Sequence, residues 1–311
     1  MKGLVVENQK IVIQDSLQKP VPNSGEVLVK VAYASINPTD LENIAGKYDF
    51  WLKLLGGNYS VKTGLEFSGE VVQDGIRFLK GEKVFGYVDL MKGIKTHQEY
   101  ISIHEDYIAP MPENLQFEQA AALPLGALTS LVALQDLGKV NPNSKLLING
   151  ASGGLGVYAI QIGKLLGASV TAVAGAKQQQ FLKELGADQV LDYQEKKLEE
   201  LEQRFDLLLD LSNQKAFSQI KHLLNKRGMF IPAEPNKHVL DILRGYFTSK
   251  QTKGLFVDKG NYQKLSQIAK WVEEERLQVF VDSVYNFLDY QKAFQRLNEK
   301  GRRGRVILKI N

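Results

Sequence analysis

Two patterns of apolar residues divide the chain. Up to about residue 115, apolar and polar residues alternate over short runs such as GEVLVKVAYA (25–34) and GLEFSGEVVQ (64–73). Gly, Pro and Asn separate these runs, and two more runs of this kind lie at 81–88 and 97–103. Alternation of this kind is typical of β-strands that bury one face. The first part of the chain is therefore predicted to be rich in β-structure.

From residue 145 onward, short apolar runs alternate with segments of helical period. The predicted strands lie at 145–150, 169–175, 189–193, 205–211 and 229–233, and the predicted helices at 154–167, 177–186, 195–204 and 213–228. Strands that alternate with helices ending in glycine indicate a parallel sheet covered by helices on both faces. We therefore expect a doubly wound α/β domain over roughly residues 120–260.

The last part of the chain mixes both kinds of element. A predicted helix at 260–277 is followed by a strand at 277–287, a helix at 290–299 and a strand at 304–310. The pattern alone allows this tail either to extend the parallel sheet or to join the β-rich first part.

Composition and charge exclude several classes of protein. The 39 Lys and Arg residues are scattered among 35 Asp and Glu residues, so nucleic acid is not an expected partner. The longest apolar stretch, which begins at Ala120, contains Pro, Thr and Ser and is too short to span a membrane. Because the N-terminus also lacks a signal-peptide pattern, we expect a cytoplasmic protein. The absence of cysteine excludes disulfides, iron–sulfur clusters and cysteine-based zinc sites.

Four glycines lie in the stretch NGASGGLGVYA (149–159), between a predicted strand and a predicted helix. Gly154, Gly156 and Ala159 match the pattern G-x-G-x-x-A in the context that this motif requires. A pyrophosphate can approach the amides of such a turn because no side chains block it, and the helix start favours an anion. We therefore predict a dinucleotide site formed by Gly150, Ser152, Gly153, Gly154, Leu155 and Gly156.

The end of the second predicted strand indicates which dinucleotide binds. NAD-binding domains usually carry an acid about 20 residues after the glycines, where it accepts a hydrogen bond from the ribose 2′-hydroxyl. No carboxylate occurs from Gly167 to Lys183, Gly175 leaves room, and Lys177 supplies a positive charge. Tyr193, at the end of the third strand, either reaches the same phosphate or is a half-buried strand residue. We predict NADPH as the cofactor, bound also by Gly175, Lys177 and Tyr193.

Six stretches occur in a characteristic order: ASINPTDLENIAGKY (34–48), GLEFSGEVV (64–72), AAALPLGALTSLVAL (120–134), NGASGGLG (149–156), LGADQVLDY (185–193) and KGRRGRVILKI (300–310). In this order they resemble the zinc-independent medium-chain dehydrogenase/reductases, specifically the NADPH:quinone oxidoreductase (zeta-crystallin-like) branch. The resemblance implies a GroES-like β-rich catalytic domain (residues 1–118 and 278–311) and a Rossmann NADPH-binding domain (residues 119–277), with the active site between them. It also implies a homodimer, for which the segment GLFVD (254–258) is the candidate strand.

The chain departs from the zinc-using relatives at two positions. Those relatives carry Cys near Asn37 and Gly-His-Glu where this chain has Gly64-Leu65-Glu66, and their structural zinc lobe needs four cysteines. A site improvised from His97, His104 and Glu66 is conceivable, but a pair of strand histidines is more often structural. We therefore predict no metal site.

The resemblance assigns Asn37, Tyr48 and Thr129 to the cleft as catalytic residues. Each has an alternative role: Asn37 forms a turn before a proline, Tyr48 is buried with its hydroxyl satisfied, or Thr129 bonds its own helical turn. Asp40 is predicted to cap a short helix rather than to act as a base.

Hydride transfer to an already polarised acceptor requires only a few hydrogen-bond donors and no metal. We therefore predict NADPH-dependent reduction of a small-molecule quinone or α,β-unsaturated carbonyl. The alternatives are an enoyl-thioester reductase and a non-catalytic NADPH-binding protein. The sequence does not identify the physiological acceptor.

Overall fold

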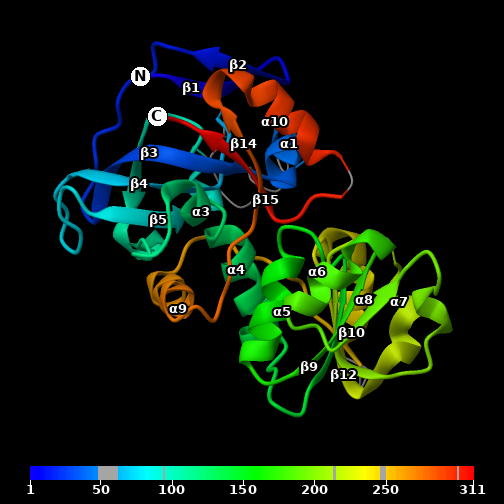
Figure 1. The fold of residues 1–311 in the computed structure, drawn as a ribbon. Helices are drawn as coiled ribbons and strands as arrows, with labels where there is room; N and C mark the ends of the chain where they lie inside the picture. Colours follow the sequence, from blue (N-terminus) through cyan, green and yellow to red (C-terminus); the bar gives the residue numbers. More distant parts are fainter. Residues whose placement is uncertain (48–61, 94, 213–214, 246–249, 300) are drawn as a thin grey trace.

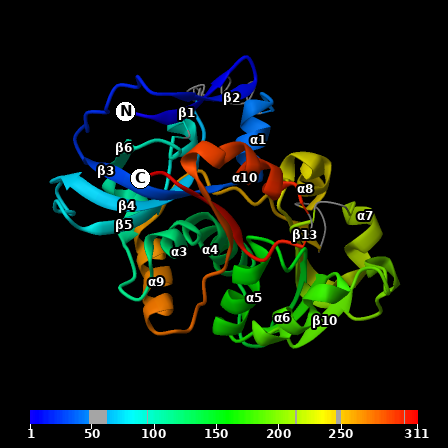
Figure 2. The ribbon, with the colours of Figure 1, turned by 45° about the horizontal axis from the view of Figure 1, so that its top comes forward.

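The structure of the protein is a computed structural model that describes every residue except 48–61, 94, 213–214, 246–249 and 300. Figure 1 shows two sheets in separate halves of the molecule. Both chain ends lie in the half that carries the blue, cyan and red strands, and the green and yellow elements form the other half. The view in Figure 2 shows α4 (Pro124–Leu131) between the two halves, and α9 (Tyr262–Glu273) packs against it.

The first sheet consists of six parallel strands in the described part of the chain, in the order β10-β9-β8-β11-β12-β13. They are β8 (Lys145–Asn149), β9 (Ser169–Ala174), β10 (Gln189–Asp192), β11 (Phe205–Asp210), β12 (Leu224–Pro232) and β13 (Gln251–Thr252). The strand order reverses between β8 and β11, where a doubly wound sheet leaves a crevice at the carboxyl ends of its strands. This order confirms the predicted Rossmann fold.

Helices connect these strands and cover the sheet. They are α5 (Gly156–Leu165), α6 (Gln179–Glu184), α7 (Phe217–Ile220) and α8 (Val239–Gly245). Before the sheet, α3 (Phe117–Ala121) and α4 (Pro124–Leu131) occupy the apolar stretch that begins at Ala120, and α4 continues into a π-helical turn over Val132–Leu137. No helix among the described residues has the length and hydropathy needed to cross a bilayer.

The second sheet combines strands from both ends of the chain, in the order β14-β15-β3-β4-β5-β7 with β6 paired to β3. They are β3 (Glu26–Ile36), β4 (Glu66–Gln73), β5 (Lys83–Tyr87), β6 (Tyr100–His104), β7 (Ile108–Pro110), β14 (Val281–Asn286) and β15 (Arg305–Lys309). Because β15 pairs antiparallel with β3, the tail joins the first part of the chain and does not extend the Rossmann sheet.

The remaining elements flank this GroES-like domain. They are the hairpin β1 (Gly3–Glu7) and β2 (Lys10–Gln14), and the helices α1 (Pro38–Ile44), α9 (Tyr262–Glu273) and α10 (Tyr290–Leu297). The domain boundaries at 118 and 278 stay a prediction, which the sheet membership supports.

Two predicted helices are wrong in extent. The segment 195–204 contains a single 3-10 turn at Leu198–Glu200. In the segment 213–228, the structure places an α-helix only at Phe217–Ile220, because β12 already begins at Leu224 and pairs there with Phe205 of β11. Ladder hydrogen bonds therefore override a helical pattern of apolar residues.

The predicted strand at 254–258 is also wrong. Its carbonyl groups bond to the GroES-like domain instead of forming a ladder: Tyr87 Oη donates to the Val257 carbonyl at 3.1 Å, and the Leu90 amide donates to the Asp258 carbonyl at 2.7 Å. The sheet edge is β13, which ends at Thr252. The homodimer itself stays a prediction, without this strand as its contact.

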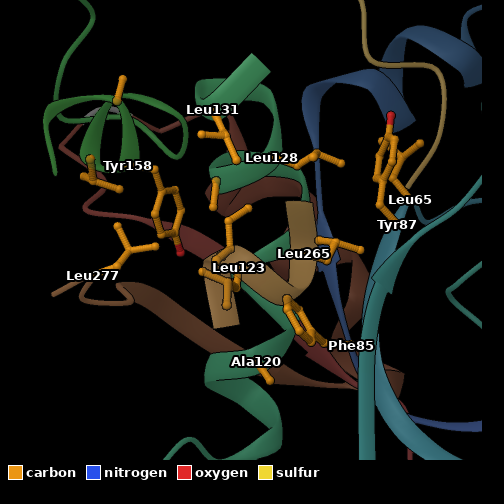
Figure 3. Close-up of a cluster of buried hydrophobic side chains, with 14 of the residues drawn as sticks. Leu65, Phe85, Tyr87, Ala120, Leu123, Leu128, Leu131, Tyr158, Leu265 and Leu277 are labelled. Atoms are coloured by element: carbon orange, nitrogen blue, oxygen red, sulfur yellow. The ribbon is translucent and has the colours of Figure 1, made fainter. Parts of the chain in front are cut away.

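A single hydrophobic cluster runs through both domains. It includes Phe85 of β5, Leu128 of α4, Tyr158 of α5 and Leu265 of α9, all of which are buried (Figure 3). Domains that share a large apolar interface keep a fixed orientation, whereas polar interfaces permit relative motion. The surfaces that meet between the two sheets are therefore held in place before any ligand binds.

Candidate active site

The predicted glycine turn follows β8, beside the end of β11. Gly150 has a φ of +83°, a left-handed conformation that favours glycine. A Cβ on Gly156, the first residue of α5, would overlap the backbone of Ala151. Directly before the turn, Asn149 Nδ2 donates a hydrogen bond to Asp210 Oδ1 at 2.9 Å. This bond joins the ends of β8 and β11. The turn therefore requires glycine at both positions and is anchored at the switch point of the sheet.

Gly154 faces a side chain from the other domain. A Cβ built on Gly154 would lie 3.0 Å from Arg305 Cδ and 3.1 Å from Arg305 Nε. Ser130 of α4 also holds the turn, because its hydroxyl donates to the Leu155 carbonyl at 3.0 Å. The glycine turn and a guanidinium group are thus in close contact.

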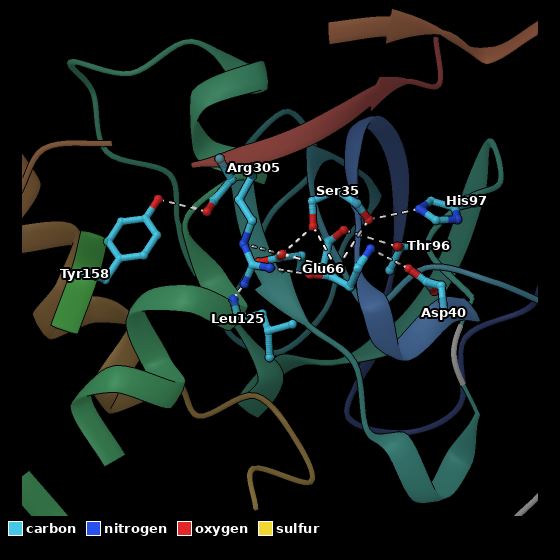
Figure 4. A network of polar contacts seen from close by, with 10 residues as sticks. Ser35, Asp40, Glu66, Thr96, His97, Leu125, Tyr158 and Arg305 are labelled. Atoms are coloured by element: carbon cyan, nitrogen blue, oxygen red, sulfur yellow. Dashed lines mark hydrogen bonds and ion pairs between the residues drawn. The ribbon is translucent and has the colours of Figure 1, made fainter. Parts of the chain in front are cut away.

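Arg305, at the start of β15, is buried with 4% of its surface exposed. Its Nη1 donates to Asn37 Oδ1 at 2.5 Å, and its Nε lies 3.5 Å from Glu66 Oε1 (Figure 4). Its Nη2 is buried and has no hydrogen-bond partner among the described residues. An unsatisfied buried N–H group is costly, so this nitrogen has the capacity to bind an anion.

Glu66, the carboxylate beside Arg305, is fully buried and joins three elements. Its Oε1 accepts a hydrogen bond from the Ser35 hydroxyl at the end of β3. Its Oε2 accepts from the Leu125 amide in the first turn of α4, at 2.5 Å. Both carboxylate oxygens are therefore engaged by protein donors, and the network fixes α4 relative to β3 and β15.

Asn37 and Asp40 form the start of α1. The backbone N–H of Asn37 donates to Asp40 Oδ2 at 2.9 Å, and the backbone N–H of Gly64 donates to Asp40 Oδ1 at 2.7 Å. Burial raises the pKa of Asp40 above its usual range, and the charge of His97 and these amide bonds only partly oppose that effect. Asp40 is thus the predicted helix cap. The side chain of Asn37 is bonded to Arg305 and, through Nδ2 at 2.9 Å, to the Ser35 hydroxyl.

The histidines considered as metal ligands are separated in the structure. His97 is buried between Thr63 Oγ1 at 2.8 Å and the Ser35 carbonyl at 3.0 Å, whereas His104 lies at the surface beside Asp106. Among the described residues, no three His, Asp or Glu side chains are arranged to hold a metal ion. The absence of a metal site stays a prediction, which the engaged oxygens of Glu66 support.

Thr129 lies on α4 and is 7% exposed. Its Oγ1 is buried without a hydrogen-bond partner in the described part of the chain, so it does not bond its own helical turn as the alternative required. Thr129 Oγ1 is thus, like Nε and Nη2 of Arg305, one of several buried polar atoms without a partner in the described part of the chain. Tyr48, the third predicted catalytic residue, lies outside the described residues.

Replacing Thr129 with Val tests whether this hydroxyl serves a ligand. Removing an unsatisfied buried hydroxyl without changing the shape of the side chain should raise the free energy of unfolding of the ligand-free protein by about 1 kcal/mol. Turnover should fall about tenfold if the hydroxyl pairs with a bound nicotinamide. Urea unfolding and steady-state kinetics measure the two effects. A loss of stability with unchanged turnover would assign Thr129 to packing alone.

The residues predicted to bind the 2′-phosphate follow β9 and β10. Lys177 is exposed and lies in the 3-10 turn Ala176–Gln178 that comes directly after Gly175. Tyr193 is 52% exposed, and its hydroxyl lies 3.5 Å from the position of a Cβ on Gly175. Asp192, the acid next to Tyr193, is buried and accepts from the Gln194 amide at 2.9 Å. The surface around Gly175 is thus basic and aromatic.

Local sequence patterns do not reveal the role of Arg305, because its partners Asn37, Glu66 and Gly154 are far away in the sequence. The only signal was three arginines in KGRRGRVILKI (300–310), which a solvated surface would equally explain. The glycine turn, the Arg305 guanidinium and the unpaired Thr129 hydroxyl suit an extended anionic ligand with one polar uncharged end. The residues present therefore fit a dinucleotide.

These features define a class of fold: a GroES-like domain joined to a Rossmann domain, with a buried arginine of the first lying against the glycine turn of the second. Comparisons with known proteins agree. The family model for the alcohol dehydrogenase GroES-like domain matches residues 23–113, and that for zinc-binding dehydrogenases matches residues 185–308.

Similar proteins cover nearly the full chain. The NAD(P)H oxidoreductase RTN4IP1, mitochondrial, of Drosophila melanogaster is 28% identical, over 92% of this chain and 79% of its own. The chloroplastic quinone-oxidoreductase homolog of Spinacia oleracea is 28% identical, over 93% and 91%. The solved structure of the quinone oxidoreductase from Coxiella burnetii has a TM-score of 0.88 and 27% identity, over 100% and 99% of the two chains.

The chain belongs to the medium-chain dehydrogenase/reductase family of oxidoreductases, as the resemblance in the sequence indicated. Two of these relatives are named for organelles, so the predicted cytoplasmic location gains no support from them.

Proposed function

We propose that this protein is an NADPH-dependent, metal-independent reductase of quinones or α,β-unsaturated carbonyls. The contact between Gly154 and Arg305 carries the proposal, because it joins a glycine turn to a buried guanidinium whose Nε and Nη2 have no hydrogen-bond partner among the described residues. The similarity to proteins named quinone oxidoreductase indicates the class of acceptor. The basic surface around Gly175 favours NADPH over NADH.

In this proposal, different residues of the chain bind different parts of the cofactor. The amides at Gly154 and Gly156 and the Nη2 of Arg305 bind the pyrophosphate, and Lys177 and Tyr193 bind the 2′-phosphate. Thr129 orients the nicotinamide through its free hydroxyl. Asn37 acts by positioning Arg305, since both ends of its amide are bonded within the network.

The bound cofactor supplies a hydride from C4 of its nicotinamide ring. When the acceptor is a quinone or an enone, the negative charge appears on a carbonyl oxygen, which a few donors can stabilise, and solvent provides the proton. A zinc ion is unnecessary for this chemistry. The acid that zinc-using relatives share, Glu66, is here bonded to the Ser35 hydroxyl and the Leu125 amide and paired with Arg305.

Binding and turnover of the purified protein test the proposal together. Titration calorimetry should give a dissociation constant for NADPH at least about tenfold below that for NADH. Loss of the reduced-nicotinamide absorbance should then require a quinone or an enal and should persist after dialysis against a chelator. Heat from neither nucleotide would overturn the proposal. Turnover only with enoyl thioesters, or binding without turnover, would identify one of the two alternative functions.

A further inference from the structure

Arg303 connects the two domains at the adenosine end of the proposed nucleotide site. It precedes β15 of the GroES-like domain, yet its Nε donates to Gln178 Oε1 at 2.8 Å and its Nη2 donates to the Lys177 carbonyl at 3.3 Å. Its guanidinium carbon lies 4.8 Å from the centre of the Phe181 ring. Three contacts thus hold this exposed arginine against the turn that follows β9.

The same short segment reaches the ends of two neighbouring strands. Arg305 lies against Gly154 in the turn after β8, and Arg303 lies against Lys177 in the turn after β9, which is paired with β8. Gly304 separates the two arginines in a left-handed conformation with a φ of +91°. A dinucleotide whose pyrophosphate binds at Gly154 extends its adenosine toward the end of β9. The segment therefore follows the adenylate half of such a ligand.

The positive charge of Arg303 is available to an anion. Its side chain bonds an amide oxygen and a carbonyl oxygen, both neutral, and no carboxylate pairs with it in the described part of the chain. The two nearby acids, Asp282 and Glu299, both pair with Arg296 at 2.9 and 2.8 Å. The remaining N–H groups of a planar guanidinium are well suited to two oxygens of one phosphate.

We propose that Arg303 is a specificity-determining residue, which binds the 2′-phosphate of NADPH from the GroES-like domain, opposite Lys177 and Tyr193. This inference rests on the proposed NADPH dependence. It adds that nucleotide choice is made by both domains and therefore depends on their docking. The residues after β9 alone would supply only half of the phosphate site.

The test compares Arg303→Ala with Arg302→Ala by titration calorimetry against two small probes, adenosine 2′,5′-bisphosphate and adenosine 5′-monophosphate. Arg302→Ala is the matched control because it removes the same charge one residue away. The Nε of Arg302 donates to the Glu299 carbonyl at 3.3 Å rather than to the turn after β9. Arg303→Ala should weaken the bisphosphate about tenfold more than the monophosphate. Arg302→Ala should leave the ratio of the two affinities within about twofold of wild type, and Arg303→Lys should recover part of the loss.

Each of the following outcomes would overturn either this inference or the proposed function on which it rests. Equal losses for both probes in Arg303→Ala would mean that Arg303 only docks the domains. The same change of ratio in Arg302→Ala would mean that general surface charge is responsible. If the wild-type protein binds the bisphosphate no better than the monophosphate, the proposed NADPH dependence fails first. Thermal unfolding without ligand, which should change by no more than a few degrees, checks that every variant is folded.

Discussion

Replacing Arg305 with Met is expected to lower the free energy of unfolding by about 3 kcal/mol, because it removes one partner of a buried ion pair. Glu66 would keep its bonds to Ser35 and to the Leu125 amide but would lose its ion pair with Arg305 Nε at 3.5 Å. Asn37 Oδ1 would lose its donor as well. Urea unfolding measures the loss, and nucleotide binding should fall with it because the donor beside Gly154 is gone.

A double variant separates the ion pair from simple packing. Glu66→Gln removes the charge that Arg305→Met would leave uncompensated, so the double variant should be more stable than the sum of the two single losses by about 2 kcal/mol. Additive losses, within about 0.5 kcal/mol, would show that the two side chains are not energetically coupled. Nucleotide affinity should stay low in the double variant, because restored stability does not restore the guanidinium.

Replacing Gly154 with Val is expected to weaken NADPH binding by at least about 100-fold, equivalent to about 3 kcal/mol. The new Cβ would lie only 3.0 Å from Arg305 Cδ, and its methyl groups would occupy the space through which a pyrophosphate approaches the amides. The contact with Arg305 and the blocked approach to the amides would both weaken binding of the pyrophosphate. Calorimetry with NADPH measures the loss, and circular dichroism confirms the fold.

Gly163→Ala provides the matched control for Gly154→Val. Gly163 lies on α5, the helix that follows the glycine turn, and its added Cβ would meet the side-chain ends of Leu146 at 2.9 Å and Val170 at 3.1 Å. This control should lower stability through crowding in the core while NADPH affinity stays within about twofold of wild type. A comparable loss of affinity in both variants would mean that packing of α5, rather than access to the turn, governs binding.

Local patterns predicted the elements with strong, short-range signals. The β-runs at 25–34 and 64–73 became β3 and β4, and the glycine turn has the expected context between β8 and α5. Residues 195–204 and 213–228 were predicted wrongly because the helical period of their apolar residues was weaker than the tertiary constraints. Leu198 and Leu201 are buried although their segment forms no α-helix, and Leu224 pairs with Phe205 in the sheet.

The candidate site was predictable only in part, for the same reason. Gly154 and Lys177 belong to local motifs, and the missing acid after β9 could be read directly from the residues. Arg303 and Arg305 could not, because each works through partners more than 120 residues away, such as Lys177 and Asn37. The unpaired hydroxyl of Thr129 is likewise visible only when every neighbouring donor and acceptor is in place.

The sequence alone determined the fold class, the family and the position of the glycine turn between β8 and α5, because hydrophobic period and glycine geometry act over a few residues. Only the tertiary structure decided that the tail returns to β3 and thereby places Arg305 between Glu66 and Gly154. Chain topology brings charged groups together irrespective of their separation in sequence. Burial then makes an unpaired donor such as Arg305 Nη2 costly in the ligand-free protein.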